Sequence, residues 1–283
     1  MSDNEFVPSP PTMNRTAPTP DAADAPAWSP AELQQPHAEP DKAQRVQRMF
    51  TAIARSYDLN NRLHSFGRDQ AWRAAAVRMA RLQPTDRVVD VACGTGDLTL
   101  AFARQLAELS DRPQPVLGLD FTPSMLDIAR VKADRVRGGV RGAAAGDIEF
   151  ENGDATSLDL PDACCDVVSI AFGIRNVDRP EAALAEFYRV LRPGGRLIVL
   201  EFTVPHRRLM RWGYDLYCGV IMPRTATLIA GDRSGAYRYL PRSVNTFGSR
   251  EKMTALIEST GFSDVQSRPL TMGIATCYRG TKR

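Results

Sequence analysis

The sequence predicts an α/β fold in which a seven-stranded, mostly parallel sheet is flanked by helices, and three observations lead to it. From residue 87 onward, short apolar runs alternate with stretches of helical spacing, which is typical of repeated strand–helix units. A glycine-containing turn follows the first apolar run. Acidic residues stand at the ends of the next two runs, at the edge where parallel sheets bind ligands.

The first 40 residues are expected to form a disordered, acidic tail that precedes a single domain over residues 41–283. They hold 9 of the 20 prolines and carry six acids against one base, Arg15. A segment of this composition buries too little apolar surface to offset its conformational entropy. The remaining domain carries more basic than acidic residues.

An amphipathic helix opens the domain. Apolar side chains recur at helical spacing from Val46 through Ile53 to Tyr57, while lysine and arginine occupy the other face. We expect residues 41–72 to form a helical lid that packs on the sheet.

The strands and helices of the domain then follow in alternation. Thr122 before Pro123 supplies an N-cap and a preset first turn, so this helix has the best-defined start. A loop is expected over residues 138–146, and a glycine pair at 194–195 makes a turn. The predicted strands are residues 87–92, 115–120, 148–151, 166–174, 196–202, 264–270 and 273–278, and the predicted helices are residues 97–109, 123–137, 180–191 and 250–260.

Residues 203–248 break the alternation and are interpreted as an inserted basic cap. Together with Arg250, this stretch holds eight arginines against two acids, Asp215 and Asp232. Arginines in this number suit an anionic membrane surface. A nucleic-acid contact or a plain solvated face are the alternatives.

Composition limits the location and the chemistry of the protein. No apolar run is long enough to span a bilayer, and the N-terminus lacks the pattern of a secretory signal, so we expect a cytoplasmic protein. The five cysteines show no CxxC spacing and the three histidines lie far apart, so no metal site is expected.

The turn after the first strand brings backbone close to a ligand. Asp90 precedes the turn, and Gly94, Thr95 and Gly96 form it, so we expect these four residues to bind a cofactor. Thr99 stands where a dinucleotide-binding fingerprint has its third glycine, which disfavours a nicotinamide cofactor.

Two further strand ends complete an adenosine-shaped set of contacts. Asp120 ends the second strand, where a carboxylate accepts both hydroxyls of a ribose. Asp154 and Ala155 follow the third strand, where the carboxylate accepts from the exocyclic amine of adenine.

This arrangement resembles the class I S-adenosylmethionine methyltransferases, which have a Rossmann-like fold, and three stretches narrow the resemblance to one family. YDLNNRLHS at residues 57–65, FGIRNV at residues 172–177 and RVLRPGGR at residues 189–196 with EFT at residues 201–203 are similar to motifs of the demethylmenaquinone and 2-methoxy-6-polyprenyl-1,4-benzoquinol C-methyltransferases. The likeness covers residues 42–283. Arg192, Thr203 and Ala92 depart from the general pattern.

The resemblance implies that S-adenosyl-L-methionine donates a methyl group to a ring carbon of a polyprenyl quinol. We favour demethylmenaquinol, with menaquinol as the product. The alternatives are the benzoquinol step of ubiquinone biosynthesis and a non-catalytic adenosyl-ligand-binding assembly partner. Nucleic acid is not an expected partner because the platform that holds a flipped base is missing after the fourth strand. Contact with the inner face of an anionic membrane and a homodimer stay open.

The resemblance and the predicted topology agree on the catalytic residues. Arg175 and Asn176 follow the fourth strand, where we expect Arg175 to stabilise a quinolate because a guanidinium keeps its proton. Tyr57 and Asp58 would close over the site from the lid, with the Asp58 carboxylate as a base. His64 is an alternative base.

Overall fold

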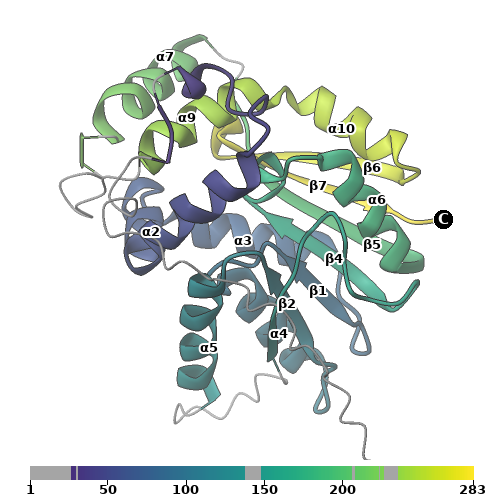
Figure 1. Ribbon diagram of the computed structural model, residues 1–283. Coiled ribbons are helices and arrows are strands. Elements are labelled where there is room, and N and C mark those ends of the chain that lie inside the picture. The colour runs from purple at the N-terminus through teal and green to yellow at the C-terminus, as the bar shows by residue number, and fades with distance from the viewer. Residues whose placement is uncertain (1–26, 30, 138–147, 206–207, 223, 226–234) are drawn as a thin grey trace, which may run out of the picture.

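The computed structural model describes residues 27–29, 31–137, 148–205, 208–222, 224–225 and 235–283 (Figure 1). A central sheet carries helices on both faces, and a separate group of helices covers one end of the sheet (Figure 1). The loop predicted over residues 138–146 lies outside the described residues.

Within the described residues the sheet has seven strands in the order β3-β2-β1-β4-β5-β7-β6. β7 runs antiparallel to β5 and β6, and the other pairs are parallel. The prediction of a seven-stranded, mostly parallel sheet is confirmed. The strands are β1 Val88–Val91, β2 Val116–Asp120, β3 Ile148–Asn152, β4 Cys165–Ala171, β5 Leu191–Phe202, β6 Ser263–Leu270 and β7 Ala275–Thr281.

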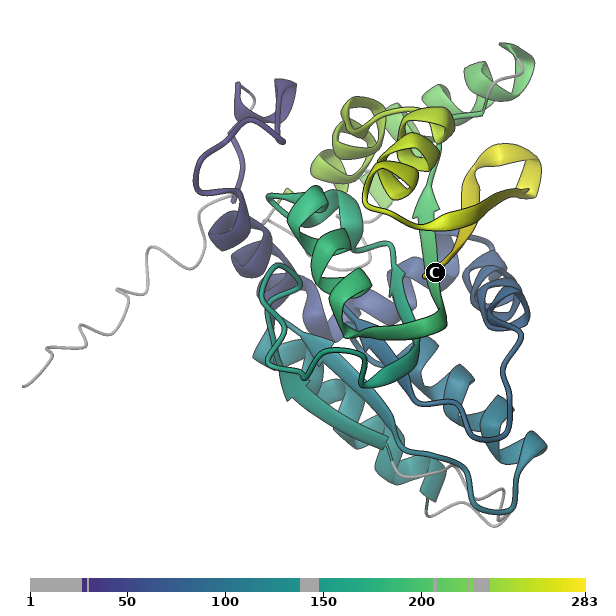
Figure 2. The same cartoon turned by 90° about the vertical axis from the view of Figure 1, so that its right-hand side faces the viewer.

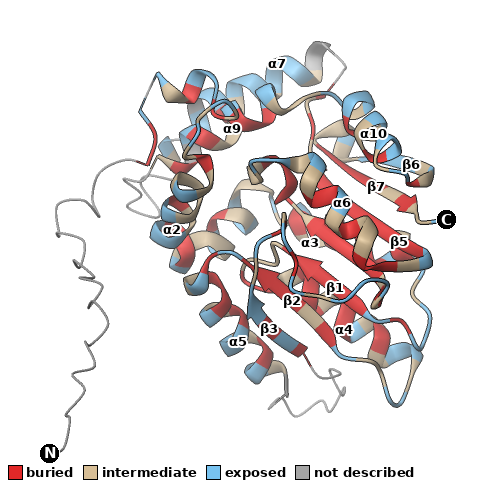
Figure 3. Cartoon of the chain, turned by 45° about the vertical axis from the view of Figure 1, so that its right-hand side comes forward, coloured by how far each residue is buried: buried red, intermediate tan, exposed pale blue. Residues whose placement is uncertain are grey.

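Helices bury both faces of the sheet, which is why most residues of its central strands are apolar and buried. Side chains of α3, α4 and α5 form the core on one face, and side chains of α6 and α10 form the core on the other (Figure 3). The helices α4 and α5 have the predicted bounds. The α-helices are α2 Lys42–His64, α3 Arg68–Ala80, α4 Asp97–Leu109, α5 Pro123–Arg137, α6 Pro180–Val190, α7 Arg208–Leu216, α9 Ala236–Phe247 and α10 Arg250–Ser259.

The lid predicted as one helix over residues 41–72 is two helices, α2 and α3, joined by a turn. Phe66 and Gly67 adopt positive φ angles of 52° and 73°, which a right-handed helix does not accommodate. The Gly67 amide donates to the Arg62 carbonyl at 2.8 Å, which satisfies an acceptor at the end of α2. Sequence periodicity missed this break because apolar residues continue through it.

The boundary expected at residue 40 also needs correction. Residues 31–40 and the preceding residues 27–29 pack on the domain and include a 3-10 turn, η1 (Glu32–Gln34). Trp28 is 3% exposed and stacks on Tyr239 of α9, with the ring centroids 4.8 Å apart. One large aromatic ring thus anchors a segment that composition alone places in the tail. Residues 1–26 lie outside the described part of the chain.

The cap predicted over residues 203–248 contains α7, the π-helical turn η3 (Tyr217–Ile221) and α9. These elements stand beside the hairpin formed by β6, η4 (Thr271–Gly273) and β7 (Figure 2). Arg207 and Arg233 of the predicted basic cap lie outside the described residues.

The fourth strand ends at Ala171, three residues earlier than predicted. Phe172 turns the chain with a φ of 56°, and the 3-10 helix η2 (Ile174–Asn176) follows. A Cβ atom on Gly173 would lie 2.7 Å from the Cβ of Ala92, so this turn passes against the end of β1. The turn therefore places η2 beside the carboxyl ends of the central strands.

Candidate active site

Two cavities meet at the carboxyl ends of the central strands. The strand-end cavity, of about 120 Å³, lies over β1, β2 and β4 and is lined by Gly94, Asp120 and Asp154, among others. The helix-lined cavity, of about 420 Å³, lies between the lid helices and the cap. Phe50 and Tyr57, together with Phe172, line both cavities, so these three rings separate them.

Asp120 is fixed in the strand-end cavity by backbone donors. Its Oδ2 accepts from the Gly94 amide at 2.8 Å, and its Oδ1 accepts from the Thr122 amide at 2.8 Å. Burial raises the pKa of this carboxyl group. Each oxygen keeps a lone pair for a further donor, so a pair of ligand hydroxyls would find oriented acceptors here.

Asp154 and Ala155 line the same cavity, as predicted. Oδ1 of Asp154 accepts from both the amide and the hydroxyl of Thr156 at 2.8 Å, which fixes the carboxylate in a turn. Ala155 is buried. The three predicted strand ends thus converge on one cavity.

The residues of the glycine turn differ in their relation to the strand-end cavity: Gly94 lines it, whereas Thr95 and Gly96 do not. A Cβ atom on Gly94, with a φ of 57°, would meet no atom within 4 Å, so this glycine opens onto the cavity. At Gly96 a Cβ atom would lie 2.9 Å from the Phe150 ring. Gly96 is therefore required for packing against β3, and neither Gly96 nor Thr95 lines the cavity.

The predicted cofactor ligand Asp90 points away from the cavity. It is buried, and its two oxygens accept from the hydroxyls of Thr99, at 2.7 Å, and Ser169, at 2.6 Å. Burial raises its pKa to about 6. Because these bonds join β1 to α4 and β4, Asp90 holds the turn in place from beneath.

Asp58 does not face either cavity as a base. Its oxygens accept from the Thr95 hydroxyl at 2.6 Å and from Lys132 Nζ at 2.9 Å. The same ammonium group bonds to Asp97. Together, Asp58, Thr95, Asp97 and Lys132 join α2 to the glycine turn and to α5. The role of Lys132 could not be predicted from the sequence because its partners are distant in the chain.

Arg175 is a buried side chain on the wall of the helix-lined cavity. Its Nη1 donates to Glu201 Oε1 at 2.6 Å and to the Phe172 carbonyl at 2.6 Å. Glu201 is 2% exposed and also accepts from the Phe202 amide at 2.7 Å. A guanidinium held in this way keeps its charge and its orientation. This glutamate belongs to the EFT motif, and no role was predicted for it.

Asn176 lines the strand-end cavity, although its neighbour Arg175 lines the other. Its Oδ1 accepts from the Tyr239 hydroxyl at 3.0 Å, and its Nδ2 donates to the Phe172 carbonyl at 3.2 Å. The turn η2 therefore presents one polar side chain to each cavity. Tyr57, between the cavities, has a pKa that burial raises, so its phenol remains protonated.

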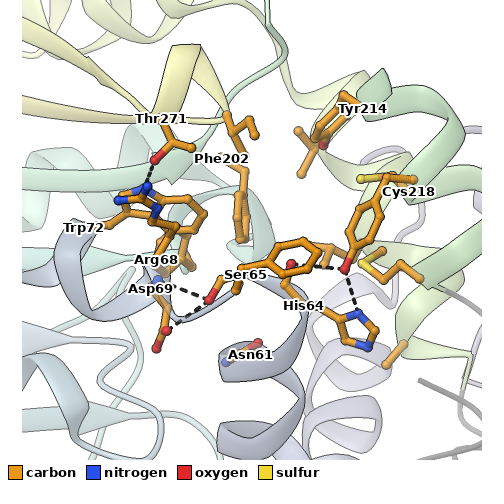
Figure 4. Close-up of a pocket in the computed structure, with 18 of the residues that line it drawn as sticks. Asn61, His64, Ser65, Arg68, Asp69, Trp72, Phe202, Tyr214, Cys218 and Thr271 are labelled. Carbon is orange, nitrogen blue, oxygen red and sulfur yellow. Dashed lines mark hydrogen bonds between the residues drawn. The ribbon is translucent and has the colours of Figure 1, made fainter. Parts of the chain in front are cut away.

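The helix-lined cavity is mostly apolar, and several of its polar groups bond to one another (Figure 4). Trp72 Nε1 donates to the Thr271 hydroxyl at 2.7 Å. His64 Nδ1 lies 3.1 Å from the Tyr217 hydroxyl, and burial lowers the pKa of the imidazole. The apolar lining includes Met49, Ile53, Met210, Met222, Val244 and Ile274. Such a cavity suits a long hydrocarbon chain.

The described residues lack two features, a cluster of metal ligands and a membrane-spanning helix. No three His, Cys, Asp or Glu side chains there gather where a metal ion could be held. None of the helices in this part of the chain combines the length and the apolar character that crossing a membrane requires.

Comparison with solved structures shows the fold. A SAM-dependent methyltransferase from Thermotoga maritima aligns with a TM-score of 0.53 and 23% identity, covering 83% of this chain and 98% of that one. A SAM-dependent methyltransferase from Aquifex aeolicus aligns with a TM-score of 0.54 and 16% identity, covering 82% and 98%. The predicted Rossmann-like class I methyltransferase fold is confirmed.

Sequence comparison shows the family. A demethylmenaquinone methyltransferase from Deinococcus radiodurans is 45% identical over 86% of this chain and 95% of its own length. One from Thermus thermophilus is 44% identical over 83% and 100%, and a ubiquinone/menaquinone biosynthesis C-methyltransferase from Geobacter sulfurreducens is 42% identical over 86% and 90%. The model of the ubiE/COQ5 methyltransferase family matches residues 39–282. The chain is a member of the ubiE/COQ5 methyltransferase family.

Proposed function

We propose that this enzyme transfers a methyl group from S-adenosylmethionine to a ring carbon of demethylmenaquinol, forming menaquinol. The observation that carries the proposal is the pair of cavities that share Tyr57, Phe50 and Phe172. One cavity offers carboxylates at strand ends, and the other is larger and apolar. A polar adenosyl ligand and an apolar prenylated ring would meet across these three rings.

The strand-end cavity fits the adenosyl cofactor. Asp120 would accept from the ribose hydroxyls, and Asp154 with Ala155 would contact the adenine. The backbone at Gly94 is free of side-chain atoms on the cavity side, so a ligand could approach it closely. When bound, the cofactor supplies a methyl group on a positively charged sulfur.

The residues of the chain supply alignment and charge. Arg175, held by Glu201, would stabilise the negative oxygen of the quinolate, which forms when the quinol hydroxyl next to the target carbon releases its proton to water before the ring is enclosed. Tyr57 would orient the ring, because its phenol stands where the cavities join. Holding the reacting atoms in line is worth about 7 kcal/mol or more in well-oriented models. The apolar lining would exclude water from this point.

A benzoquinol ring is the second candidate acceptor. The relative from Geobacter sulfurreducens is named for both ubiquinone and menaquinone biosynthesis, whereas the relatives from Deinococcus and Thermus are named for demethylmenaquinone alone. The higher identity to the latter pair favours the naphthoquinol. We further infer that a cytoplasmic enzyme meets this acceptor at the inner face of the membrane.

A direct assay tests the proposal. The purified full chain is incubated with methyl-labelled S-adenosylmethionine and either demethylmenaquinol or the demethylated benzoquinol, each with the same short prenyl chain. We expect label in the naphthoquinol product, and none with Arg175→Met. Asp162→Asn, an exposed surface change, is the matched control and should retain activity. Labelling of the benzoquinol alone, or of neither ring, would overturn the proposal.

A further inference from the structure

Large apolar side chains stand exposed on the segments that line the helix-lined cavity. Phe66 is 80% exposed and also lines the cavity, so it marks where the cavity opens to solvent. Met272 is 66% exposed and follows Thr271, which lines the cavity from the hairpin side. We define the mouth rim by the exposed residues of these segments and of the adjoining helix α7: Leu63, Phe66, Trp212, Leu216 and Met272.

Two positions of the mouth rim adopt an unfavourable backbone conformation. The φ angles of Phe66 and Met272 are 52° and 57°, in the left-handed region that favours glycine and asparagine. Both turns contact residues that line the cavity. The ring centroids of Phe66 and Tyr217 lie 5.8 Å apart, and Thr271, the residue before Met272, accepts a hydrogen bond from Trp72. The fold thus exposes two large apolar side chains to water on strained turns. This indicates that the two side chains contact a binding partner and not the rest of the chain.

The segments that carry the mouth rim lie on one side of the molecule. The hairpin of β6 and β7, the helix α7 and the start of α3 are neighbours in Figure 2. Figure 4 shows Arg68, Tyr214 and Thr271, one residue from each of these segments, around the same cavity. A flat surface that met the mouth rim would therefore cover the cavity opening.

We propose that the mouth rim is a docking surface for an anionic lipid bilayer, and that the prenyl tail of the acceptor enters the cavity directly from the lipid. The tail entry rests on the proposed function, whereas the docking rests on the rim itself. The apolar rim continues into an apolar cavity, so a hydrocarbon chain could pass between bilayer and protein without crossing water.

Charge favours a lipid surface over a second copy of this chain. Arg62 and Arg68 flank Phe66 in the sequence, Arg211 precedes Trp212, and all three arginines are exposed. Part of this charge is balanced within the chain, since Arg62 Nε lies 3.3 Å from Asp69 Oδ1 and Arg211 Nε lies 3.0 Å from Asp215 Oδ2. In an anionic leaflet, exposed arginines would contact the headgroups, and the apolar side chains beside them would enter the acyl layer. A second copy would bring the same positive charges to the contact and would be repelled.

The test measures partitioning of the full chain onto vesicles of mixed phosphatidylcholine and phosphatidylglycerol. The variant Phe66→Asn with Met272→Asn removes the apolar tips, and asparagine tolerates the left-handed turns. We expect its partition coefficient to fall about tenfold. The control, Leu109→Gln with Val131→Gln, changes apolar residues of α4 and α5 that are 41% and 49% exposed and should partition like the parent protein. A second pair, Leu63→Gln with Trp212→Gln, tests the same rim without touching either turn.

Activity separates this proposal from the proposed function. Met272→Asn should leave transfer to a water-soluble, short-chain quinol unchanged and lower transfer to a long-chain quinol in vesicles. Lower partitioning without methylation of any quinol would support docking and contradict the proposed acceptor. Equal partitioning of the rim variants and the parent would overturn docking, as would rim variants that change only the oligomeric state in sedimentation.

Discussion

The two cavities that meet at Tyr57 are built by different rules. The strand-end cavity takes its polar groups from the ends of neighbouring parallel strands, so topology alone brings Gly94, Asp120 and Asp154 together. The helix-lined cavity takes its lining from α2, α3, α7, η3, α9 and the β6–β7 hairpin, from Met49 to Ile274. In the strand-end cavity, backbone amides fix the acceptor Asp120. The other cavity depends on side-chain packing between helices.

This difference explains what could be predicted from the sequence. Alternating apolar runs predicted the mostly parallel sheet and the bounds of α4 and α5, and the motifs at strand ends placed Asp120 and Asp154 at one edge, where both line the same cavity. Their role as cofactor ligands stays a prediction. The packing of helices obeys no comparable rule, so the break at Phe66, the buried Trp28 and the Arg175–Glu201 pair were missed. Asp90 and Asp58 were assigned wrongly because sequence position does not show which way a carboxylate points.

The largest expected effect comes from breaking the ion pair on the wall of the helix-lined cavity. Arg175→Ala leaves the Glu201 carboxylate buried without its partner, which should lower the free energy of unfolding by about 3–5 kcal/mol. Denaturant unfolding measures this loss. The double variant Arg175→Met with Glu201→Leu should recover most of the stability and none of the methyl transfer. Recovery of both would show that the pair is only structural.

Trp28 tests whether the segment before α2 supports the same cavity. Trp28→Ala removes the ring that stacks on Tyr239, whose hydroxyl donates to Asn176. We expect a loss of about 3 kcal/mol in the free energy of unfolding and a higher KM for the acceptor. Removing residues 1–26 is the control and should change neither. An unaltered melting temperature in Trp28→Ala would restore the tail boundary at residue 40.

Asp90 tests the rigidity of the strand-end cavity through pH. Burial raises its pKa from 3.8 to about 6, so the folded state binds this proton more tightly than the unfolded state does. Its contribution to stability is therefore complete below pH 4 and is lost as pH rises through 6, a change of about 3 kcal/mol. Asp90→Asn does not titrate, so its melting temperature relative to the parent should rise over this range. Parallel pH profiles for the two proteins would contradict the assignment.

Asp120 tests the cofactor side of the comparison directly. Asp120→Ala removes an acceptor that the Gly94 and Thr122 amides already orient. The affinity for S-adenosylmethionine, measured by calorimetry, should fall by about 1–3 kcal/mol, the usual scale for hydrogen bonds to a charged acceptor. Acceptor binding in the helix-lined cavity should persist. Unchanged cofactor affinity in the folded variant would remove Asp120 from the site.

The smallest expected effect distinguishes the two sources of membrane attraction, arginine charge and apolar rim. Arg211 Nε lies 3.0 Å from Oδ2 of Asp215, one turn later in α7, so part of the arginine charge is already neutralised within the protein. An unpaired surface base contributes roughly 1 kcal/mol of attraction to an anionic leaflet. We therefore expect Arg211→Gln to lower vesicle partitioning only a few-fold, less than the loss of Phe66 and Met272, and to lose its effect at high salt. If Arg211→Gln instead abolished partitioning while the rim variants bound normally, charge would carry the attachment and the apolar rim would need another explanation.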